Sequence, residues 1–357
     1  MSKFITQRRA WIATAAVLGM ALLTLGGCGY YAQSIGGHLD LMAKRQDIGT
    51  LVEDESTPAE LKKKLERAEA IREFAIEELA LPDDGSYRSY VDVGKPYVTW
   101  NVIATPALSL KPKTWCFPVV GCVSYRGYFE ESDAREYADE LASEDMDVAV
   151  AGARAYSTLG WFDDPILNTI LFDAEYHFAG TLFHELTHER LFVAGDSSFN
   201  ESYAVAVERE GVRRWLARNA TPAMQTAYDR ERGRREEFLE LVLATRGDLE
   251  TLYASSMDDA DKSREKARLF DALRAGFTEL KAYWGGYTGY DRWFASDLNN
   301  AKLALLATYN VYVPAFEQLL AEQQGDMSKF HEAVAVLSKL PKEERHAKLE
   351  RLAAGQS

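Results

Sequence analysis

Residues 173–216 read DAEYHFAGTLFHELTHERLFVAGDSSFNESYAVAVEREGVRRWL and contain an H-E-x-x-H pattern at 184–188. On an α-helix, side chains four positions apart lie on one face, one turn apart, so His184 and His188 can reach the same metal ion. Glu185 then faces the remaining open position, where it can take a proton from a metal-bound water. The spacing therefore predicts a helix that carries one zinc ion per chain.

A catalytic zinc takes three protein ligands and a water, so the two histidines need a third partner. Glu201 follows His188 by thirteen residues and begins a second predicted helix, and we predict that its carboxylate completes the site. Glu208 lies two turns further along the same face and is the alternative ligand. Whichever glutamate does not bind the metal can accept the N–H of a ligating histidine, and this role is assigned to Glu208.

Three further polar residues in this stretch are not expected to bind the metal. His177 lies on the same helix face as His184 but about 10 Å away along the axis, so it is expected beside a ligand or in the core. Glu189 and Glu210 are expected in solvent. The alternative for the whole pattern is that the two histidines bind no metal and make their hydrogen bonds in the core or at the surface.

The chain has 357 residues, of which 47% are hydrophobic and 27% are charged, and its formal net charge is −14. This is an ordinary globular composition, sufficient for one large domain or two small ones. The acidic charge argues against nucleic acid and against an anionic membrane surface as partners. It does not identify a substrate.

The N-terminal residues have the composition of an export signal. Basic residues precede an apolar run at 11–25, which ends in Gly26-Gly27-Cys28. We interpret residues 1–27 as a signal peptide that is removed. The cysteine after two small residues resembles the lipobox of bacterial lipoproteins, which implies a lipid on Cys28 and a place in the cell envelope, at the outer membrane facing the periplasm. A plain secretory signal or an uncleaved anchor helix is the alternative.

The middle of the chain, at about 86–170, changes from helical to alternating patterns. Short runs of β-branched and aromatic residues predict the strands of a small antiparallel sheet at 97–104, 122–129 and 147–151. Cys116 and Cys122 are the only cysteines after Cys28. In an exported protein, two cysteines this close are expected to form a disulfide that closes a small loop.

The remainder of the chain is predicted to be helical. A tether at 28–50 is expected to lead into a helix at 58–81, and helices fill most of the C-terminal part at about 221–357. With the site helices at about 173–218, we expect one compact unit over 51–357. The predicted fold class is α+β, mostly α, with a small sheet and a large helical C-terminal part.

His184, Glu185, His188 and the later Asn200-Glu201 resemble the gluzincin metallopeptidases, which bind zinc with two histidines and a glutamate. Together with the lipobox and the segment GWFDDP at 160–165, they make the whole chain resemble the bacterial lipoprotein family of predicted, or putative, aminopeptidases. The resemblance implies a zincin-like fold, a peptide substrate, zinc bound by His184, His188 and Glu201, and Glu185 as general base. One departure is Val205, where related enzymes place an aspartate.

In the zincin fold, a strand before the active helix runs along the cleft and pairs with extended substrate. Residues 156–168 precede His184 and are the candidate, although their glycine, proline and paired aspartates also fit a surface loop. Asp163 and Asp164 are candidates to hold the free ammonium of an aminopeptidase substrate. The resemblance thus favours an aminopeptidase; an envelope endopeptidase and an inactive structural or binding lipoprotein are the alternatives.

Hydrolysis of a peptide bond passes through an oxyanion that needs a hydrogen-bond donor. Tyrosines of the C-terminal helices can supply one. Tyr309 is the first candidate, with Tyr287 and Tyr290 behind it, and the alternative for each is a place in the aromatic core.

Overall fold

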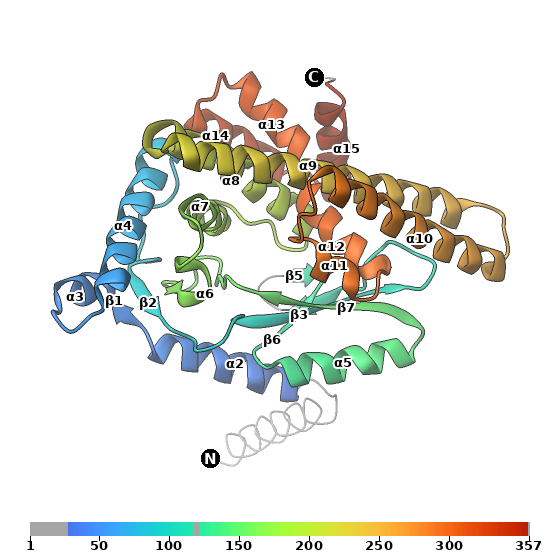
Figure 1. Cartoon of the computed structure of the whole chain (residues 1–357), viewed down its shortest axis with the longest axis horizontal. Helices are drawn as coiled ribbons and strands as arrows, with labels where there is room; N and C mark the ends of the chain where they lie inside the picture. The colour runs from blue at the N-terminus through green and yellow to red at the C-terminus, as the bar shows by residue number, and fades with distance from the viewer. Residues whose placement is uncertain (1–27, 118–120, 356–357) are drawn as a thin grey trace, which may run out of the picture.

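The computed structural model describes residues 28–117 and 121–355, so the predicted signal peptide at 1–27 lies outside the described residues. The fold is α+β and mostly helical, which confirms the predicted class at that level. Figure 1 shows the strands in the lower half of the view, between two helices below them and the C-terminal helices above. Within the described ranges, no helix combines the length and the apolar character that crossing a membrane requires.

The central sheet is antiparallel and has the strand order β6-β3-β7. Its strands are β3 (Thr99–Pro106), β6 (Arg126–Tyr128) and β7 (Met146–Ala153), close to the predicted positions. β7 is an edge strand that pairs with β3 along its whole length. Helix α5 (Glu131–Ser143) packs on this sheet through Ala134, Ala138 and Leu141.

Two smaller pairings complete the strands of the described chain. A hairpin of β4 (Trp115–Phe117) and β5 (Gly121–Val123) carries a disulfide between Cys116 and Cys122. The other sheet has the order β1-β2-β8, from β1 (Gln46–Asp47), β2 (Ser89–Val91) and β8 (Ile166–Leu167). β2 and β8 are parallel. They lie outside the three strands that the sequence predicted to form an antiparallel sheet, and those three do pair antiparallel.

Residues 28–50, expected to be a tether, form regular structure that is docked on the sheet. They contain α2 (Cys28–Ala43), β1 and the start of α3 (Ile48–Glu53). On α2, the Tyr30 ring stacks on Phe117 at a centroid distance of 5.5 Å. A Cβ at Gly37 would lie 2.2 Å from the Phe129 ring, so only glycine permits this close approach. The tether prediction failed because these contacts come from residues far away in the sequence.

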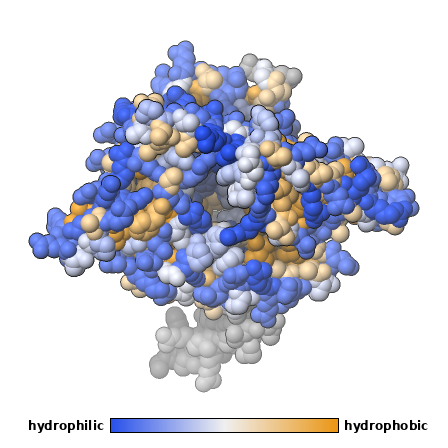
Figure 2. Space-filling view, in the orientation of Figure 1, coloured by the Kyte–Doolittle hydropathy of each residue, from blue (hydrophilic) through white to orange (hydrophobic). Residues whose placement is uncertain are grey.

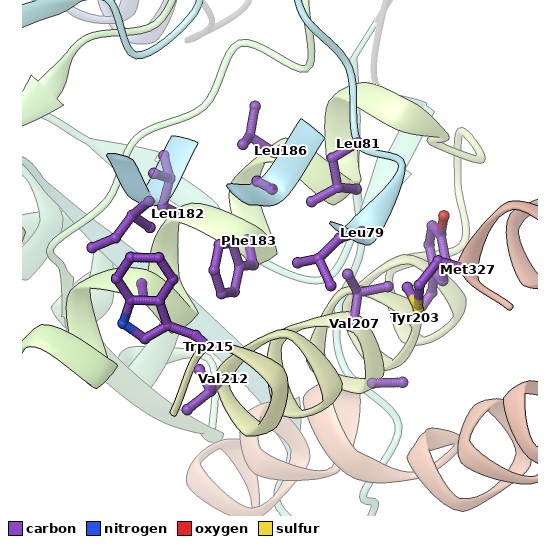
Figure 3. Packing of buried hydrophobic residues seen from close by; sticks show 14 of the residues in the cluster. Leu79, Leu81, Leu182, Phe183, Leu186, Tyr203, Val207, Val212, Trp215 and Met327 are labelled. Carbon is purple, nitrogen blue, oxygen red and sulfur yellow. The ribbon is translucent and has the colours of Figure 1, made fainter. Parts of the chain in front are cut away.

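Two helices at the centre of the molecule carry the H-E-x-x-H pattern and Glu201. They are α7 (Glu175–Arg190) and α8 (Ser197–Asn219), and together with α4 (Ala59–Leu79) they form the main hydrophobic core. Figure 3 shows Phe183 of α7 between Trp215 of α8 and Leu79, and Leu186 farther along α7 on the side of Leu81. The close crossing of α7 and α8 uses Gly211, where a Cβ would lie 2.5 Å from the Phe183 ring.

The C-terminal part is helical, as predicted. Figure 1 shows α9 (Pro222–Ala254) and α10 (Asp259–Tyr283) as a long pair that extends beyond the rest of the molecule. α12 (Asn300–Asn310) packs against α8, β3 and β7, so it contacts both the helix that carries Glu201 and the central sheet. The remaining helices are α6 (Asn168–Leu171), α11 (Asp291–Ala295), α13 (Val313–Glu322), α14 (Met327–Ser338) and α15 (Lys342–Ala353).

Candidate metal centre and active site

His184 and His188 lie on the buried face of α7, one turn apart, and Glu201 faces them from α8. The Nε2 atom of His184 lies 3.2 Å from both the Nε2 of His188 and the Oε2 of Glu201. The distance from His188 Nε2 to Glu201 Oε2 is 3.5 Å. Three donor atoms thus converge on one point, and together these residues could hold a metal ion.

The size of this triangle can be compared with the requirements of a metal. In a tetrahedral zinc site with bonds of about 2.0–2.1 Å, the ligand atoms lie about 3.3–3.4 Å apart. The three observed distances of 3.2, 3.2 and 3.5 Å match this spacing. Two imidazole nitrogens and one carboxylate oxygen are also a donor set that zinc accepts. The residues present therefore fit the metal.

Glu208 occupies the place predicted for a partner of a ligating histidine. Its Oε2 atom lies 3.3 Å from His184 Nδ1, while the other ring nitrogen faces Glu201. A neutral imidazole has one N–H, and if Nδ1 donates it to Glu208, the lone pair of Nε2 points at the converging donors. Gly180 makes room for Glu208, because a Cβ there would lie 3.2 Å from the Glu208 Cγ.

Without a cation, the same groups hold a proton instead. Burial lowers the pKa of His184, but the hydrogen bonds with Glu201 and Glu208 outweigh burial and raise this pKa to about 10. Burial raises the pKa of Glu201, and the two imidazoles reverse the effect and lower it to about 2. A metal must therefore displace a proton from His184, so its affinity for this site will rise with pH.

The three donors open onto a cavity of about 590 Å³ that also contains Glu185. Figure 2 shows the viewed face hollowed near its centre. Burial raises the pKa of Glu185, while the imidazoles of His184 and His188 lower it. A carboxylate of raised basicity beside an open metal position is suited to accept a proton from water.

Two tyrosines line the cavity next to the converging donors. The ring of Tyr309, from α12, stacks near His184 at a centroid distance of 6.2 Å. The carboxylate of Glu201, followed by burial, raises the pKa of Tyr309 well above its ordinary value, so the phenol stays a donor at neutral pH. Tyr125 follows β5, and burial together with Glu201 and Glu185 raises its pKa as well.

Sequence reasoning missed Tyr125. It stands in an alternating run that was assigned to the sheet, and nothing local distinguishes it from a packed aromatic residue. The structure brings it to the cavity because the chain turns between β5 and β6. By contrast, Tyr287 and Tyr290 pack with Trp284 and Phe238 of the α9–α10 cluster, at centroid distances of 6.3 Å and 4.2 Å, and do not line the cavity.

The segment at 156–168 is partly at the cavity and partly away from it. Its first residues, Tyr156, Ser157 and Leu159, line the cavity beyond the end of β7, and Leu159 stands in a turn. Beyond them the chain forms a loop, and the short strand β8 pairs with β2 rather than lying along the cavity. All three strands of the central sheet border the cavity, through Thr99 and Asn101 of β3, Gly127 of β6 and Ala153 at the end of β7.

Asp163 and Asp164 are not among the residues that line the cavity in the described chain. Asp164 is fully buried, and its carboxylate accepts hydrogen bonds from the backbone N–H and hydroxyl of Thr158 at 2.6 and 2.9 Å. Asp163 is exposed, and its carbonyl oxygen accepts a bond from Arg45 at 2.9 Å. Asp164 therefore stabilises the loop. The structure does not support the prediction that either residue binds a substrate ammonium group.

Three other assignments also change. His177 is neither in the core nor beside a ligand: it is exposed and pairs with Glu231 of α9 at 2.8 Å. Glu189, expected in solvent, has both carboxylate oxygens buried, and burial raises its pKa to about 8. Glu210 is half-buried and binds Arg213 and Arg214 at 2.7 and 2.6 Å. Sequence periodicity could not show these contacts, which depend on neighbouring elements.

A comparison with protein families now adds to this geometry. Residues 29–349 match the family described as "Putative aminopeptidase". The chain belongs to this family. The match covers the sheet, both site helices and most of the C-terminal helices, so the family description applies to the whole unit and indicates a peptidase with a peptide substrate. No curated protein and no solved structure matches the chain significantly.

Proposed function

We propose that the protein is a zinc-dependent metallopeptidase of the aminopeptidase type, with a zincin-like arrangement of its site helices. The observation that carries the proposal is the triangle of His184, His188 and Glu201 at the cavity that contains Glu185. Membership of the family supports the peptidase activity. The donor set supports zinc, because two histidines and a glutamate leave one position of a tetrahedral ion open.

A bound zinc ion would supply a Lewis acid that polarises the scissile carbonyl and lowers the pKa of water. Glu185 accepts a proton from the attacking water and later delivers it to the leaving amine. Tyr309 or Tyr125 donates a hydrogen bond to the developing oxyanion, since both phenols lie in the cavity and stay protonated. Glu208 holds the imidazole of His184 in one tautomer.

An endopeptidase is the second candidate, and one observation favours it. The acidic residues that line the cavity in the described chain are Glu185, Glu201 and Asp173. The first two have roles in the chemistry, and Asp173 pairs with Arg154 at 2.7 Å. No further carboxylate of the described lining is available for a substrate ammonium group. Comparing an amino-acid arylamide with its N-acetylated form separates the two: cleavage of only the free amine supports the aminopeptidase, and equal cleavage supports the endopeptidase.

The decisive experiment compares the parent protein with Glu185→Gln. We expect one zinc per chain in both proteins and peptide hydrolysis only in the parent, with a loss of about 10²–10⁴-fold in kcat for the variant. A chelator should abolish the activity of the parent, and added zinc should restore it. Zinc in neither protein would reject the metal site, and equal turnover in both would reject Glu185 as the base.

We also propose that a lipid on Cys28 anchors the protein in the bacterial cell envelope, at the outer membrane facing the periplasm. The support is the sequence alone: an apolar run at 11–25 followed by Gly26-Gly27-Cys28. Labelling with a fatty acid in growing cells should mark the parent and not Cys28→Ser. Equal labelling of both would reject this position.

A further inference from the structure

One face of α2 is fixed to the body of the protein. The Gln33 amide donates to the carbonyl of Gly127 at 3.3 Å and accepts the backbone N–H of Phe129 at 3.0 Å. Tyr30 stacks on Phe117, and the guanidinium of Arg126 lies 4.1 Å from its ring centroid. The orientation of the helix about its own axis is therefore set, and its opposite face is held outward.

That outward face is apolar and carries no charge for almost three turns. Tyr31, Ile35 and Leu39 follow one another at four-residue spacing, and their side chains are 44%, 59% and 60% exposed. Residues 29–39 contain no Asp, Glu, Lys or Arg, although 27% of the whole chain is charged. A solvent-facing stripe of this kind on a strongly acidic protein indicates a surface that something covers.

A second segment adds two aromatic side chains beside this stripe. Phe162 packs on His38 of α2 at a ring centroid distance of 4.7 Å, and Trp161 next to it is 68% exposed. The hydroxyl oxygen of Thr158 accepts the N–H of Phe162 at 3.1 Å, which holds the tip in place. Five of the ten exposed large hydrophobic residues of the described chain thus come from α2 and from the tip that packs on it through Phe162.

The position of α2 in the chain indicates what covers this surface. The apolar run at 11–25 ends three residues before Cys28, where α2 begins. If a lipid on Cys28 replaces that run, as proposed above, or if the run stays in the membrane as a helix, the bilayer lies within about 10 Å of the first turn of α2. Tryptophan and tyrosine favour the boundary between lipid and water. The net charge of −14 argues against attraction to anionic headgroups, so burial of apolar side chains must supply the binding.

We propose that Tyr31, Ile35, Leu39, Trp161 and Phe162 form a membrane-docking surface that inserts into the lipid–water boundary. This rests on the membrane attachment proposed above, extends membrane contact beyond the anchor itself, and is independent of the proposed catalytic activity. The inner side of the same helix lines the catalytic cavity through Tyr30 and Ser34. Because a helix with its side chains is about 10–12 Å across, docking holds the cavity roughly that far from the bilayer.

The test uses the full chain in proteoliposomes of zwitterionic lipid. An environment-sensitive fluorophore is placed on Leu39→Cys, and on Val336→Cys as the matched control, because Val336 is 61% exposed on α14 and outside the surface. Signal from the native cysteines is subtracted with the labelled parent. We expect a blue shift and at least a several-fold stronger quenching by spin-labelled lipid at Leu39 only, and little change in high salt.

A second measurement follows Trp161 with brominated lipids and uses Trp161→Phe to isolate its signal. The triple variant Tyr31→Ser, Ile35→Ser, Leu39→Ser should lower this quenching several-fold, whereas Val336→Ser with Tyr283→Ser should not. All these positions are exposed, so circular dichroism should report an unchanged fold. Equal lipid quenching at Leu39 and Val336 would overturn the proposal. So would a shift at Leu39 that grows with protein density and is not quenched by lipid, because a second copy would then cover the face.

Discussion

The Nδ1 atom of His184 lies 3.3 Å from the Oε2 atom of Glu208, while Nε2 of the same ring faces Glu201. Glu208 thus fixes the tautomer of His184, and this leaves the Nε2 atom of the ring free to bind the metal together with Glu201. We expect Glu208→Ala to lower zinc affinity about 10–100-fold, because the ring loses the acceptor that orients it. Competition with a chromophoric chelator measures this directly.

Glu210 provides the control for that substitution, since it lies on the same helix but binds Arg213 and Arg214. Glu210→Ala should leave zinc affinity unchanged. Glu208→Gln should fall between Glu208→Ala and the parent, because its amide oxygen still accepts the N–H but carries no charge. If Glu208→Ala binds zinc as the parent does, the orienting role is wrong.

Tyr309→Phe should reduce kcat without removing the metal. Its phenol lies in the cavity, and Glu201 together with burial keeps it protonated, so it can donate to an oxyanion. Loss of one such donor costs about 10²–10³-fold in kcat. Tyr290→Phe is the matched control, because its ring stacks on Phe238 in a separate cluster at 4.2 Å. If Tyr125→Phe shows this loss of kcat and Tyr309→Phe does not, then Tyr125 is the donor to the oxyanion.

The local part of the site could be predicted from the sequence because it depends on helix periodicity. His184 and His188 are one turn apart on any helix, and Glu201 and Glu208 are two turns apart on the next. Once α7 and α8 pack together, these spacings bring the four side chains to one place. The hydrophobic pattern also predicted the C-terminal helices, since their apolar faces repeat with the helical period.

The remainder of the site depends on contacts between distant segments, which spacing does not encode. Tyr125 reaches the cavity through a turn between two short strands, and α2 reaches it by packing on Phe117 and Phe129. Asp164 illustrates the opposite error. An acidic residue in a polar loop suggested a binding role, but its carboxylate accepts bonds from Thr158 within the loop.

His331 should make the stability of the protein depend on pH. It is buried between the Tyr203 hydroxyl, at 2.6 Å, and the Leu79 carbonyl, at 2.8 Å, and burial lowers its pKa from 6.5 to about 4. The unfolded chain takes up a proton below pH 6.5 and the folded chain does not until about pH 4, so this contribution is present above pH 6.5 and is lost as the pH falls through that window. The full effect is about 3 kcal/mol.

Urea unfolding of the parent and of His331→Gln at pH 7 and pH 5, with a chelator present, tests this expectation. Glutamine can keep one of the two hydrogen bonds but takes up no proton, so the variant should lose less stability on acidification than the parent. The quantity to compare is the change in the free energy of unfolding between pH 7 and pH 5 in each protein, because other buried groups contribute equally to both. Identical losses would mean that His331 is not the group responsible.

Asp196 couples the C-terminal helix to the helix that carries Glu201. Its side chain is buried, accepts the N–H of Phe199 at the start of α8 at 3.3 Å, and binds Arg345 and His346 of α15 at 2.7 and 2.9 Å. Asp196→Asn would leave the guanidinium of Arg345 buried without an opposite charge. We expect a loss of about 3–5 kcal/mol in the free energy of unfolding.

Asp326→Asn is the matched control for this change. Asp326 caps α14 in the same way, accepting the Lys329 N–H at 3.1 Å, but its charge partner Lys329 is exposed. Its substitution should cost no more than about 1 kcal/mol. The double variant Asp196→Asn with Arg345→Met should recover much of the stability lost in Asp196→Asn, because no unpaired charge then remains buried. If the double variant is no more stable than the single one, the unpaired charge of Arg345 is not the source of the loss.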